Sequence, residues 1–333
     1  MARILITGAS GFIGGYLVAQ ALQAGHEVTA AVRPNSDLTR LNGPGLQLLQ
    51  LSLGDVSALT KQLQAAGRFD WVIHNAGVTK ALTRDAFREG NTENTRRLTM
   101  ALQETGSLPD KFLFVSSLAA LGAAATGSPM IHANQTPQPL TPYGESKLES
   151  ERYLESLSPE FPWVVVQPTA VYGPWERDIL TVIKMAKMGL EMTIGRQSQR
   201  LSFIHGSDVA RAIFQILDAE TQANHQKYIL SDGNAYTTEA LSAAIRESLG
   251  GKKTLKIRLP LGLVKQVAGI SETIGRWQNK PSPLSRDKLP ELAAENWHCD
   301  ASLLFETLQF KPEFDLYRGM RNTVEWYKQA GWL

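Results

Sequence analysis

A short glycine-rich segment near the start of the chain restricts the fold more than any other feature. Ile4–Ile6 is an apolar run typical of a buried strand, and Thr7–Gly14 (TGASGFIG) follows it and opens a helix predicted over Phe12–Ala24. In such a turn the first glycine permits the tight bend, the second permits close approach to a pyrophosphate, and the third permits close packing of helix on strand. The first helical turn binds phosphate through its free N–H groups.

The alternative is a glycine-rich turn without a ligand. Strand, turn and helix occur here together and in order, which favours a nucleotide site. We expect its contacts to come from Gly8, Ser10, Gly11, Phe12, Ile13 and Gly14.

Strands and helices alternate through the first half of the chain. Apolar runs predict further strands at Val28–Val32, Leu46–Leu51, Asp70–His74, Phe112–Val115 and Trp163–Val166. Gly25 is placed to end the first helix in the C′ position. This alternation predicts an α/β fold, a Rossmann-type doubly wound parallel sheet with helices on both faces.

The second half is less regular and predicts a smaller, mixed α/β substrate domain at the C-terminal end. Its predicted elements are helices at 206–218, 237–249, 261–276, 286–293, 301–308 and 316–329, and strands at 227–230 and 256–259. We assign residues 1–168 and 203–230 to the dinucleotide-binding domain, and residues 169–202 and 231–333 to the substrate domain. The stretch Trp277–Ser285 is predicted to be a flexible loop.

The composition excludes several classes of protein. Of the 333 residues, 43% are hydrophobic and 20% charged, which excludes wholesale disorder. The formal net charge of +2 gives no support for a nucleic-acid partner. Cys299 is the only cysteine, so an intrachain disulfide is impossible and a cytoplasmic location is expected.

Two further kinds of site are not predicted. The longest charge-free stretch, Phe112–Gly144, is interrupted by glycines and prolines, so neither a membrane span nor a membrane partner is expected. The 6 histidines lack paired ligand spacing, so no metal site is expected.

The end of the second predicted strand indicates which dinucleotide binds. Sites for NAD place an acidic residue there to bind the ribose hydroxyls. This chain has Arg33 instead, and a guanidinium can hydrogen-bond a 2′-phosphate that a carboxylate would repel. NADP(H) is therefore favoured, with NAD(H) as the alternative. A solvated surface arginine is the other interpretation of Arg33, and Asp37 complicates the assignment.

The motifs along nearly the whole chain resemble those of the extended short-chain dehydrogenase/reductase family. Beyond the glycine loop, the matching segments are Gly54-Asp55-Val56, His74-Asn75-Ala76-Gly77, Val115-Ser116-Ser117, Tyr143-x-x-x-Lys147, Gln167–Pro174 and Arg200–Asp208. Gln167 departs from the family pattern, in which arginine is commoner. The resemblance implies that the cofactor contacts extend to Asp55, Val56, Asn75, Ala76, Gly77, Tyr143, Lys147 and Pro168.

The resemblance also implies a catalytic group of Ser117, Tyr143 and Lys147. Thr141-Pro142 is a good helix start, and it places Tyr143 and Lys147 four residues apart on one helix face. A tyrosine has a pKa of about 10, and a neighbouring ammonium favours its phenolate. Tyr143 is expected to exchange the proton, Lys147 to lower its pKa, and Ser117 to hydrogen-bond the substrate oxygen.

The substrate is predicted only by class. The small apolar loop after Ser117 suits an apolar or mixed substrate, and Leu118, Thr169 and Arg200 are the candidate substrate contacts. An NADP(H)-dependent oxidoreductase acting on a carbonyl or secondary alcohol ranks first. The reason is that an arginine at this strand end, Arg33, is more like the dihydroflavonol-reductase and hydroxysteroid-dehydrogenase branches of the family. A nucleotide-sugar epimerase or dehydratase using tightly bound NAD ranks second, and a non-catalytic nucleotide sensor third. The family resemblance further implies a homodimer paired through the helices Arg84–Gln103 and Tyr143–Leu157.

Overall fold

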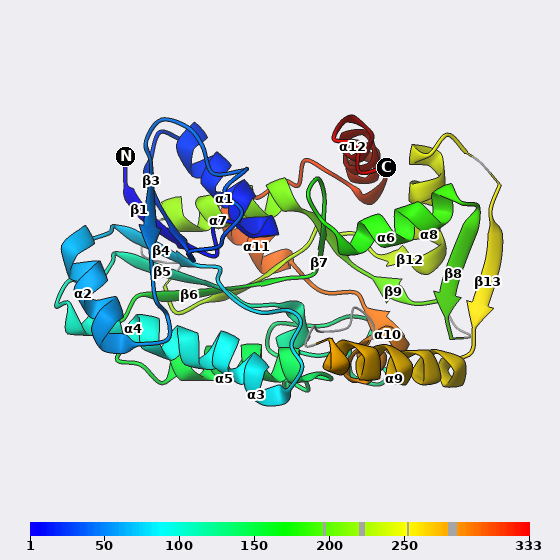
Figure 1. The fold of residues 1–333 in the computed structure, drawn as a ribbon, viewed down its shortest axis with the longest axis horizontal. Coiled ribbons are helices and arrows are strands. Elements are labelled where there is room, and N and C mark those ends of the chain that lie inside the picture. Colours follow the sequence, from blue (N-terminus) through cyan, green and yellow to red (C-terminus); the bar gives the residue numbers. More distant parts are fainter. Residues whose placement is uncertain (196–197, 220–223, 252, 279–284) are drawn as a thin grey trace.

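The computed structural model describes residues 1–195, 198–219, 224–251, 253–278 and 285–333. Among these residues, seven strands form one parallel sheet in the order β11-β6-β5-β4-β1-β2-β3 (Figure 1). The strands are β1 (Arg3–Thr7), β2 (Glu27–Val32), β3 (Leu46–Gln50), β4 (Trp71–His74), β5 (Lys111–Val115), β6 (Trp163–Pro168) and β11 (Lys227–Leu230). The predicted doubly wound parallel sheet is confirmed.

Helices cover both faces of this sheet and bury two apolar clusters against it (Figure 1). One face packs against α1 (Phe12–Gln23), α7 (Gly206–Asp218) and α11 (Ser302–Leu308). The other packs against α2 (Val56–Ala66), α4 (Asn94–Glu104) and α5 (Pro142–Glu155). Every residue of β5 and β6 is buried, which explains their almost continuous apolar sequence.

The buried Lys111 in β5 is the charged exception, and its position has a physical reason. Its ammonium donates a hydrogen bond to the Leu217 carbonyl, 2.8 Å away, at the C-terminal end of α7. Cations stabilise this end of a helix because its carbonyls lack intrahelical partners. Lys111 therefore fastens α7 to the sheet.

The remaining elements form a cap beside the sheet (Figure 1). Its helices are α6 (Asp178–Lys187), α8 (Thr238–Ser248), α9 (Leu261–Trp277), α10 (Leu289–Ala293) and α12 (Leu316–Gln329), and a third apolar cluster lies between α6, α8 and α12. Its strands are β7 (Ala170–Tyr172), β8 (Leu190–Ile194), β9 (Arg200–Leu201), β10 (Phe203–His205), β12 (Tyr236–Thr237), β13 (Leu255–Leu259) and β14 (Asn296–Trp297). Apart from β13, these strands were missed by the sequence analysis because two to five residues carry little periodicity. The proposed domain boundaries stay predictions.

The segment from Trp277 to Ala293 differs in part from the sequence expectation. The single helix predicted at 286–293 is instead a 3-10 turn (Arg286–Lys288) followed by α10, because Pro290 has no N–H and a helix restarts around it. The predicted flexible loop Trp277–Ser285 falls mostly outside the described residues. No helix in the described ranges is long and apolar enough to cross a membrane.

Candidate active site

The glycine loop joins β1 to α1 and leaves the start of α1 open. Gly8 has φ +67°, a left-handed conformation that favours glycine. A Cβ on Gly14 would lie 2.1 Å from the Gly8 carbonyl oxygen, so helix and loop are in direct backbone contact. In the described structure no side chain caps the N-terminus of α1. These free N–H groups and the glycine cradle fit a dinucleotide pyrophosphate.

The loop after β4 packs directly against the glycine loop. The Asn75 side-chain amide donates to the Gly8 carbonyl over 3.1 Å, and the Ala76 N–H donates to the Thr7 hydroxyl over 3.1 Å. Beneath them, the His74 ring lies 2.7 Å from the Thr7 hydroxyl and 3.1 Å from that of Thr95. His74 therefore fixes the two loops relative to each other, as a buried core group.

The burial of His74 makes a prediction about stability. Burial lowers the pKa of His74 from 6.5 to about 3, so the folded chain keeps the ring neutral while the unfolded chain protonates it. The folded-state pKa is the lower one, so this stability is present above pH 6.5 and is lost as the pH falls toward 3. Between pH 6.5 and 5 we expect a loss of up to roughly 2 kcal/mol.

Urea unfolding at several pH values measures this loss. The His74→Gln variant should show a free energy of unfolding that varies less with pH, by about one proton, over the same range. His132→Gln, which changes a half-exposed histidine, serves as the control. An unchanged slope in His74→Gln would show that other groups cause the acid sensitivity.

Arg33 directly follows the last residue of β2 and is exposed. Asp37, the nearby acid, is also exposed, and it accepts hydrogen bonds from the Thr39 N–H at 3.0 Å and the Thr39 hydroxyl at 2.6 Å, both on Oδ1. These bonds lower the pKa of Asp37. The residue directly after β2 is therefore an exposed arginine, and the acid Asp37 lies four residues further along the chain.

Arg40 is a second arginine at this edge, and the sequence analysis missed it. Its guanidinium lies 5.0 Å from the Tyr16 ring centroid and 5.1 Å from that of Trp175, and it donates to the Phe12 carbonyl over 2.8 Å. Trp175 has φ +76°, which is strained for an aromatic residue. Arg40 lies seven residues after Arg33, and nothing in that spacing predicts a contact with α1. Only the folded loop brings Arg40 over this helix.

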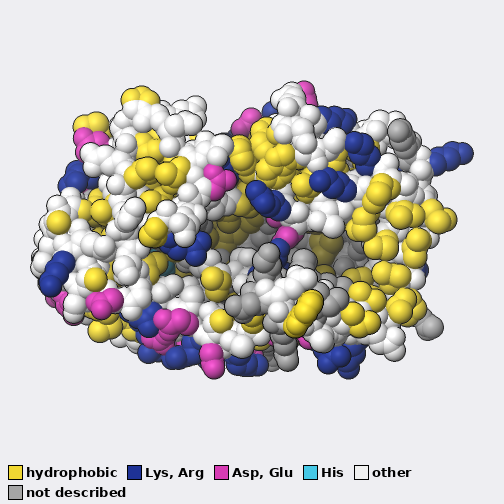
Figure 2. Space-filling view, in the orientation of Figure 1, with side chains coloured by type: hydrophobic (Ala, Val, Ile, Leu, Met, Phe, Trp, Pro, Cys, Tyr) yellow, Lys and Arg dark blue, Asp and Glu magenta, His cyan; other side chains and the backbone are white. Residues whose placement is uncertain are grey.

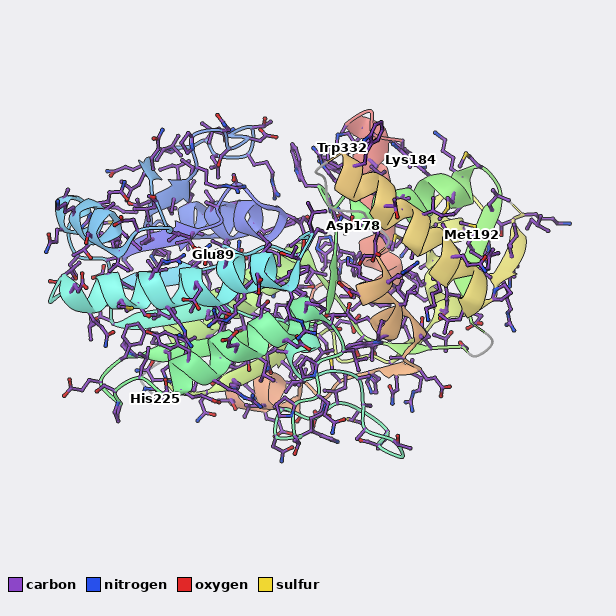
Figure 3. All side chains as sticks on the ribbon, turned by 60° about the horizontal axis from the view of Figure 1, so that its bottom comes forward. Glu89, Asp178, Lys184, Met192, His225 and Trp332 are labelled. Atoms are coloured by element: carbon purple, nitrogen blue, oxygen red, sulfur yellow. The ribbon has the colours of Figure 1, made fainter. Side chains whose placement is uncertain are left out.

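A hollow of about 280 Å³ lies over the glycine loop, between the sheet and the cap. An ion pair between Lys80 and Asp178, at 2.5 Å, joins the loop after β4 to the start of α6 beside it. Figure 3 labels Asp178 and Trp332, which lie where the two parts of the molecule meet. The lining includes Ser10, Gly11, Phe12, Arg40, Lys80 and Arg177. Three acids, Asp37, Glu176 and Asp178, line it as well, so the side chains around the hollow are balanced in charge and the N–H groups of the glycine loop are the part that fits a diphosphate.

The other predicted cofactor contacts also lie at the carboxyl end of the sheet. Asp55 is the N-cap of α2 and accepts from the Ala58 N–H at 2.8 Å, with Val56 next to it. Pro168 is the buried last residue of β6. A Cβ on Gly77 would lie 2.8 Å from the Asn91 side-chain oxygen and 3.2 Å from the Lys147 ammonium, so this glycine makes room for both side chains.

The start of α5 brings Tyr143 to Ser117. Thr141 caps the helix by accepting from the Gly144 N–H at 3.1 Å, and Pro142 occupies the first turn, as predicted. A Cβ on Gly144 would lie 2.3 Å from the Ala119 carbonyl oxygen, so the helix sits directly on the short 3-10 turn Leu118–Ala120. Ser117 is the N-cap of that turn, and its side chain lies close enough to Tyr143 to lower the pKa of that hydroxyl.

Burial sets the proton affinities of Tyr143 and Lys147. It raises the pKa of Tyr143 to about 12, and the nearby Ser117 hydroxyl opposes that rise. It lowers the pKa of Lys147 to about 8, against the attraction of Glu151. The Lys147 ammonium donates to the Val115 carbonyl at 2.8 Å, one turn of helix from Tyr143. The structure thus brings the three predicted catalytic residues together around the end of β5.

A buried polar network holds α5 in place. The Gln167 amide donates to both oxygens of Glu151, each over 3.0 Å, and the Lys227 ammonium donates to the same carboxylate over 2.9 Å. The Ser116 hydroxyl also donates to Glu151, so Ser116 is structural and Ser117 is the residue near Tyr143. Lys227 supplies the positive charge that Gln167 lacks.

Residues of the cap also reach Tyr143, and the sequence analysis missed them. A cavity of about 110 Å³ beside this tyrosine is lined from the cap by Ser285, Asp287, Lys288 and Glu291. Glu291 accepts from the Thr141 hydroxyl at 2.7 Å, and burial raises its pKa. Its charge adds to the rise in the pKa of Tyr143. A lone glutamate about 150 residues away in the chain carries no sequence signal for this position.

The three predicted substrate contacts differ in how far their side chains are exposed. Leu118 is 3% exposed within an apolar cluster, and the Thr169 hydroxyl donates to the Ser202 carbonyl at 2.8 Å. Both side chains are thus used in packing, which leaves little of them for a ligand. Arg200 is exposed at the start of β9. All three stay predictions as substrate contacts.

Comparison with known proteins gives matches over most of the chain. The model of the NAD dependent epimerase/dehydratase family matches residues 4–230. Ceramide reductase from Caulobacter vibrioides is 27% identical, over 99% of this chain and 96% of that protein. UDP-glucose 4-epimerase from Vibrio cholerae is 25% identical, over 98% of this chain and 96% of that protein.

Solved structures show the same fold. UDP-glucose 4-epimerase from Thermus thermophilus, solved in complex with NAD, superposes with a TM-score of 0.78. The sequences are 20% identical, and the match covers 98% of this chain and 99% of that one. At this identity the likeness establishes the architecture and leaves the reaction open.

Proposed function

This chain belongs to the NAD-dependent epimerase/dehydratase family, and from that premise we propose that it is an NADP(H)-dependent oxidoreductase acting on a carbonyl or secondary alcohol. Members and relatives include reductases, epimerases and dehydrogenases, so the protein is an NAD(P)-dependent enzyme rather than a sensor. The observation that carries the finer proposal is the end of β2, where the next residue is the exposed Arg33 and not an acid.

In the proposed reaction Tyr143 holds and delivers the proton. The bound nicotinamide would supply or accept the hydride. With its pKa raised to about 12, the Tyr143 hydroxyl stays protonated at neutral pH and can donate to the oxygen of a carbonyl under reduction. Ser117, whose hydroxyl lies near that of Tyr143, would hydrogen-bond the same oxygen and orient it.

Lys147 would stabilise the charge that this proton transfer leaves on Tyr143. Its pKa of about 8 keeps the ammonium mainly charged at pH 7, and its fixed hydrogen bond to Val115 keeps it in place. A positive charge next to a phenolate favours its formation. Glu151, Gln167 and Lys227 act through α5 as positioning residues.

The cofactor preference tests the proposal most directly. In a fluorescence titration of nucleotide-stripped protein, we expect NADPH to bind at least about tenfold more tightly than NADH, because a guanidinium–phosphate contact should exceed 1.4 kcal/mol. Arg33→Ala should remove the preference and leave NADH affinity unchanged. Arg321→Ala, at an exposed arginine of α12, should behave as the parent protein.

The second candidate function is a nucleotide-sugar epimerase or dehydratase with tightly bound NAD. The exposed Arg200 favours it, because a guanidinium can bind a diphosphate. Tighter binding of NADH, or NAD retained through purification, would overturn the NADP(H) proposal. Nucleotide sugars would then be screened before ketones.

Two parts of the proposal concern partners. The name of one relative, ceramide reductase, gives ceramide as its substrate. We propose that the substrate of this chain also has an apolar portion, in line with the apolar loop after Ser117. We also propose a homodimer paired through α5 and the neighbouring helical segment 84–103. Here Arg84 pairs with Glu145, and Arg88 pairs with Glu149 at 3.0 Å within one chain.

A further inference from the structure

The outer face of α9 carries a row of exposed apolar side chains. Leu263, Val267, Ile270 and Trp277 follow one another at intervals of four, three and seven residues, which places them on one side of a helix. Ile270 is 63% exposed and Trp277 is 87% exposed. We call these four residues the α9 stripe.

The fold of the cap does not need the α9 stripe. Among the α9 side chains that the structure describes, the buried ones are Val264 and Ala268, which pack with Leu289 of α10 in a separate small cluster. Leu263 and Val267 of the stripe directly precede Val264 and Ala268 in the sequence, so the stripe lies on a different side of the helix from these buried residues. An ordered apolar row that adds nothing to the core marks an interaction surface.

More apolar surface lies at the same end of the molecule. Figure 2 shows hydrophobic side chains gathered over β8, β13 and α9, with basic side chains at the rim. Leu255 in β13 is 64% exposed, and Met192 in β8 is also exposed. The apolar surface therefore extends beyond the helix itself.

The charge of this part of the chain indicates which partner it fits. Residues 252–280 contain seven Lys and Arg against one acid, Glu272. The rest of the chain contains 27 basic and 31 acidic residues, so it is net negative. Lys253, Lys256 and Lys265 are all exposed. Two copies meeting at this face would bring like charges together, whereas an anionic lipid surface would attract it.

We propose that α9 binds the surface of an anionic phospholipid bilayer, with the α9 stripe in the headgroup region and Trp277 at one end as an interfacial anchor. This goes beyond the proposed function and differs from the expectation of no membrane partner, although it involves no spanning helix. Because α9 packs against α10, which carries Glu291 to the cavity beside Tyr143, docking would hold that wall of the site next to the lipid.

Vesicle flotation with the full chain tests this proposal. We expect the protein to float with vesicles of phosphatidylcholine containing phosphatidylglycerol, and to bind at least about tenfold more weakly to pure phosphatidylcholine or in 0.5 M salt. Ile270→Asp/Trp277→Asp should weaken binding to the anionic vesicles at least about tenfold. Lys253→Glu/Lys256→Glu should weaken it as well.

Matched controls separate the stripe from general hydrophobicity. Leu48→Asp/Leu303→Asp changes two exposed leucines outside the cap, and Lys61→Glu changes an exposed lysine of α2. Both should float as the parent does, and circular dichroism confirms the fold of each variant. The proposal is overturned if the folded protein ignores anionic vesicles or if the stripe variant floats unchanged. It is equally overturned if light scattering shows that the stripe serves only to pair two copies.

Discussion

Replacing Tyr143 by phenylalanine is expected to lower kcat at least about 10³-fold while leaving NADPH affinity within about twofold. The substitution removes only the hydroxyl that would carry the proton, and general acid catalysis of this kind contributes about 10²–10⁴. The aromatic ring, which lies 6.3 Å from that of Phe87, keeps its packing. A loss in kcat without a loss in binding is the signature of an interaction used in the transition state.

Tyr153→Phe is the matched control, because it removes a hydroxyl from the same helix. Tyr153 pairs with the Thr99 hydroxyl at 3.0 Å, away from Ser117 and Lys147. This variant should keep full kcat. Stopped-flow measurement of cofactor oxidation with a carbonyl substrate makes the comparison. If Tyr143→Phe retains more than about a tenth of parental kcat, another group delivers the proton, and Glu291, which lines the cavity beside this tyrosine, is the first one to replace.

The sheet and the nucleotide loop could be predicted because their signals are local. A buried parallel strand shows as an apolar run, and the turn at Gly8 shows as glycine where a left-handed conformation is required. The pair Tyr143 and Lys147 is likewise four residues apart on one helix with its own cap and proline. Because both residues lie on one helix, the distance between them does not depend on how the rest of the chain packs.

The cap side of the site could not be predicted, because its residues meet only through tertiary packing. Glu291 reaches Thr141 across 150 positions of sequence. Lys227 replaces the charge missing at Gln167 from a neighbouring strand, β11, which a reading of the local motif alone leaves unexplained. Leu118 is the opposite case. Its position next to Ser117 in the sequence predicted a substrate contact, but the fold buries its side chain in a packed apolar cluster.

The contact between Gly14 and the glycine loop should make Gly14→Ala severely damaging. The new methyl would lie 2.1 Å from the Gly8 carbonyl oxygen and 2.7 Å from the Ala9 Cα, both backbone atoms, so α1 must move away from the loop. Overpacking of this kind costs about 1–3 kcal/mol, and we expect the upper end. The same shift moves the N–H groups of α1 from the pyrophosphate, so NADPH affinity should fall at least about thirtyfold.

Gly262→Ala separates this contact from the general effect of replacing glycine in a helix. A Cβ at Gly262 in α9 meets no heavy atom within 4 Å, so alanine should stabilise the protein by roughly 0.5–1 kcal/mol through its higher helix propensity. Urea unfolding and NADPH titration of both variants give the comparison. Opposite signs for the two substitutions would show that backbone contact at the loop, rather than helix propensity, requires glycine at position 14. A Gly14→Ala protein with parental stability and affinity would contradict the close packing of α1 on which the dinucleotide site rests.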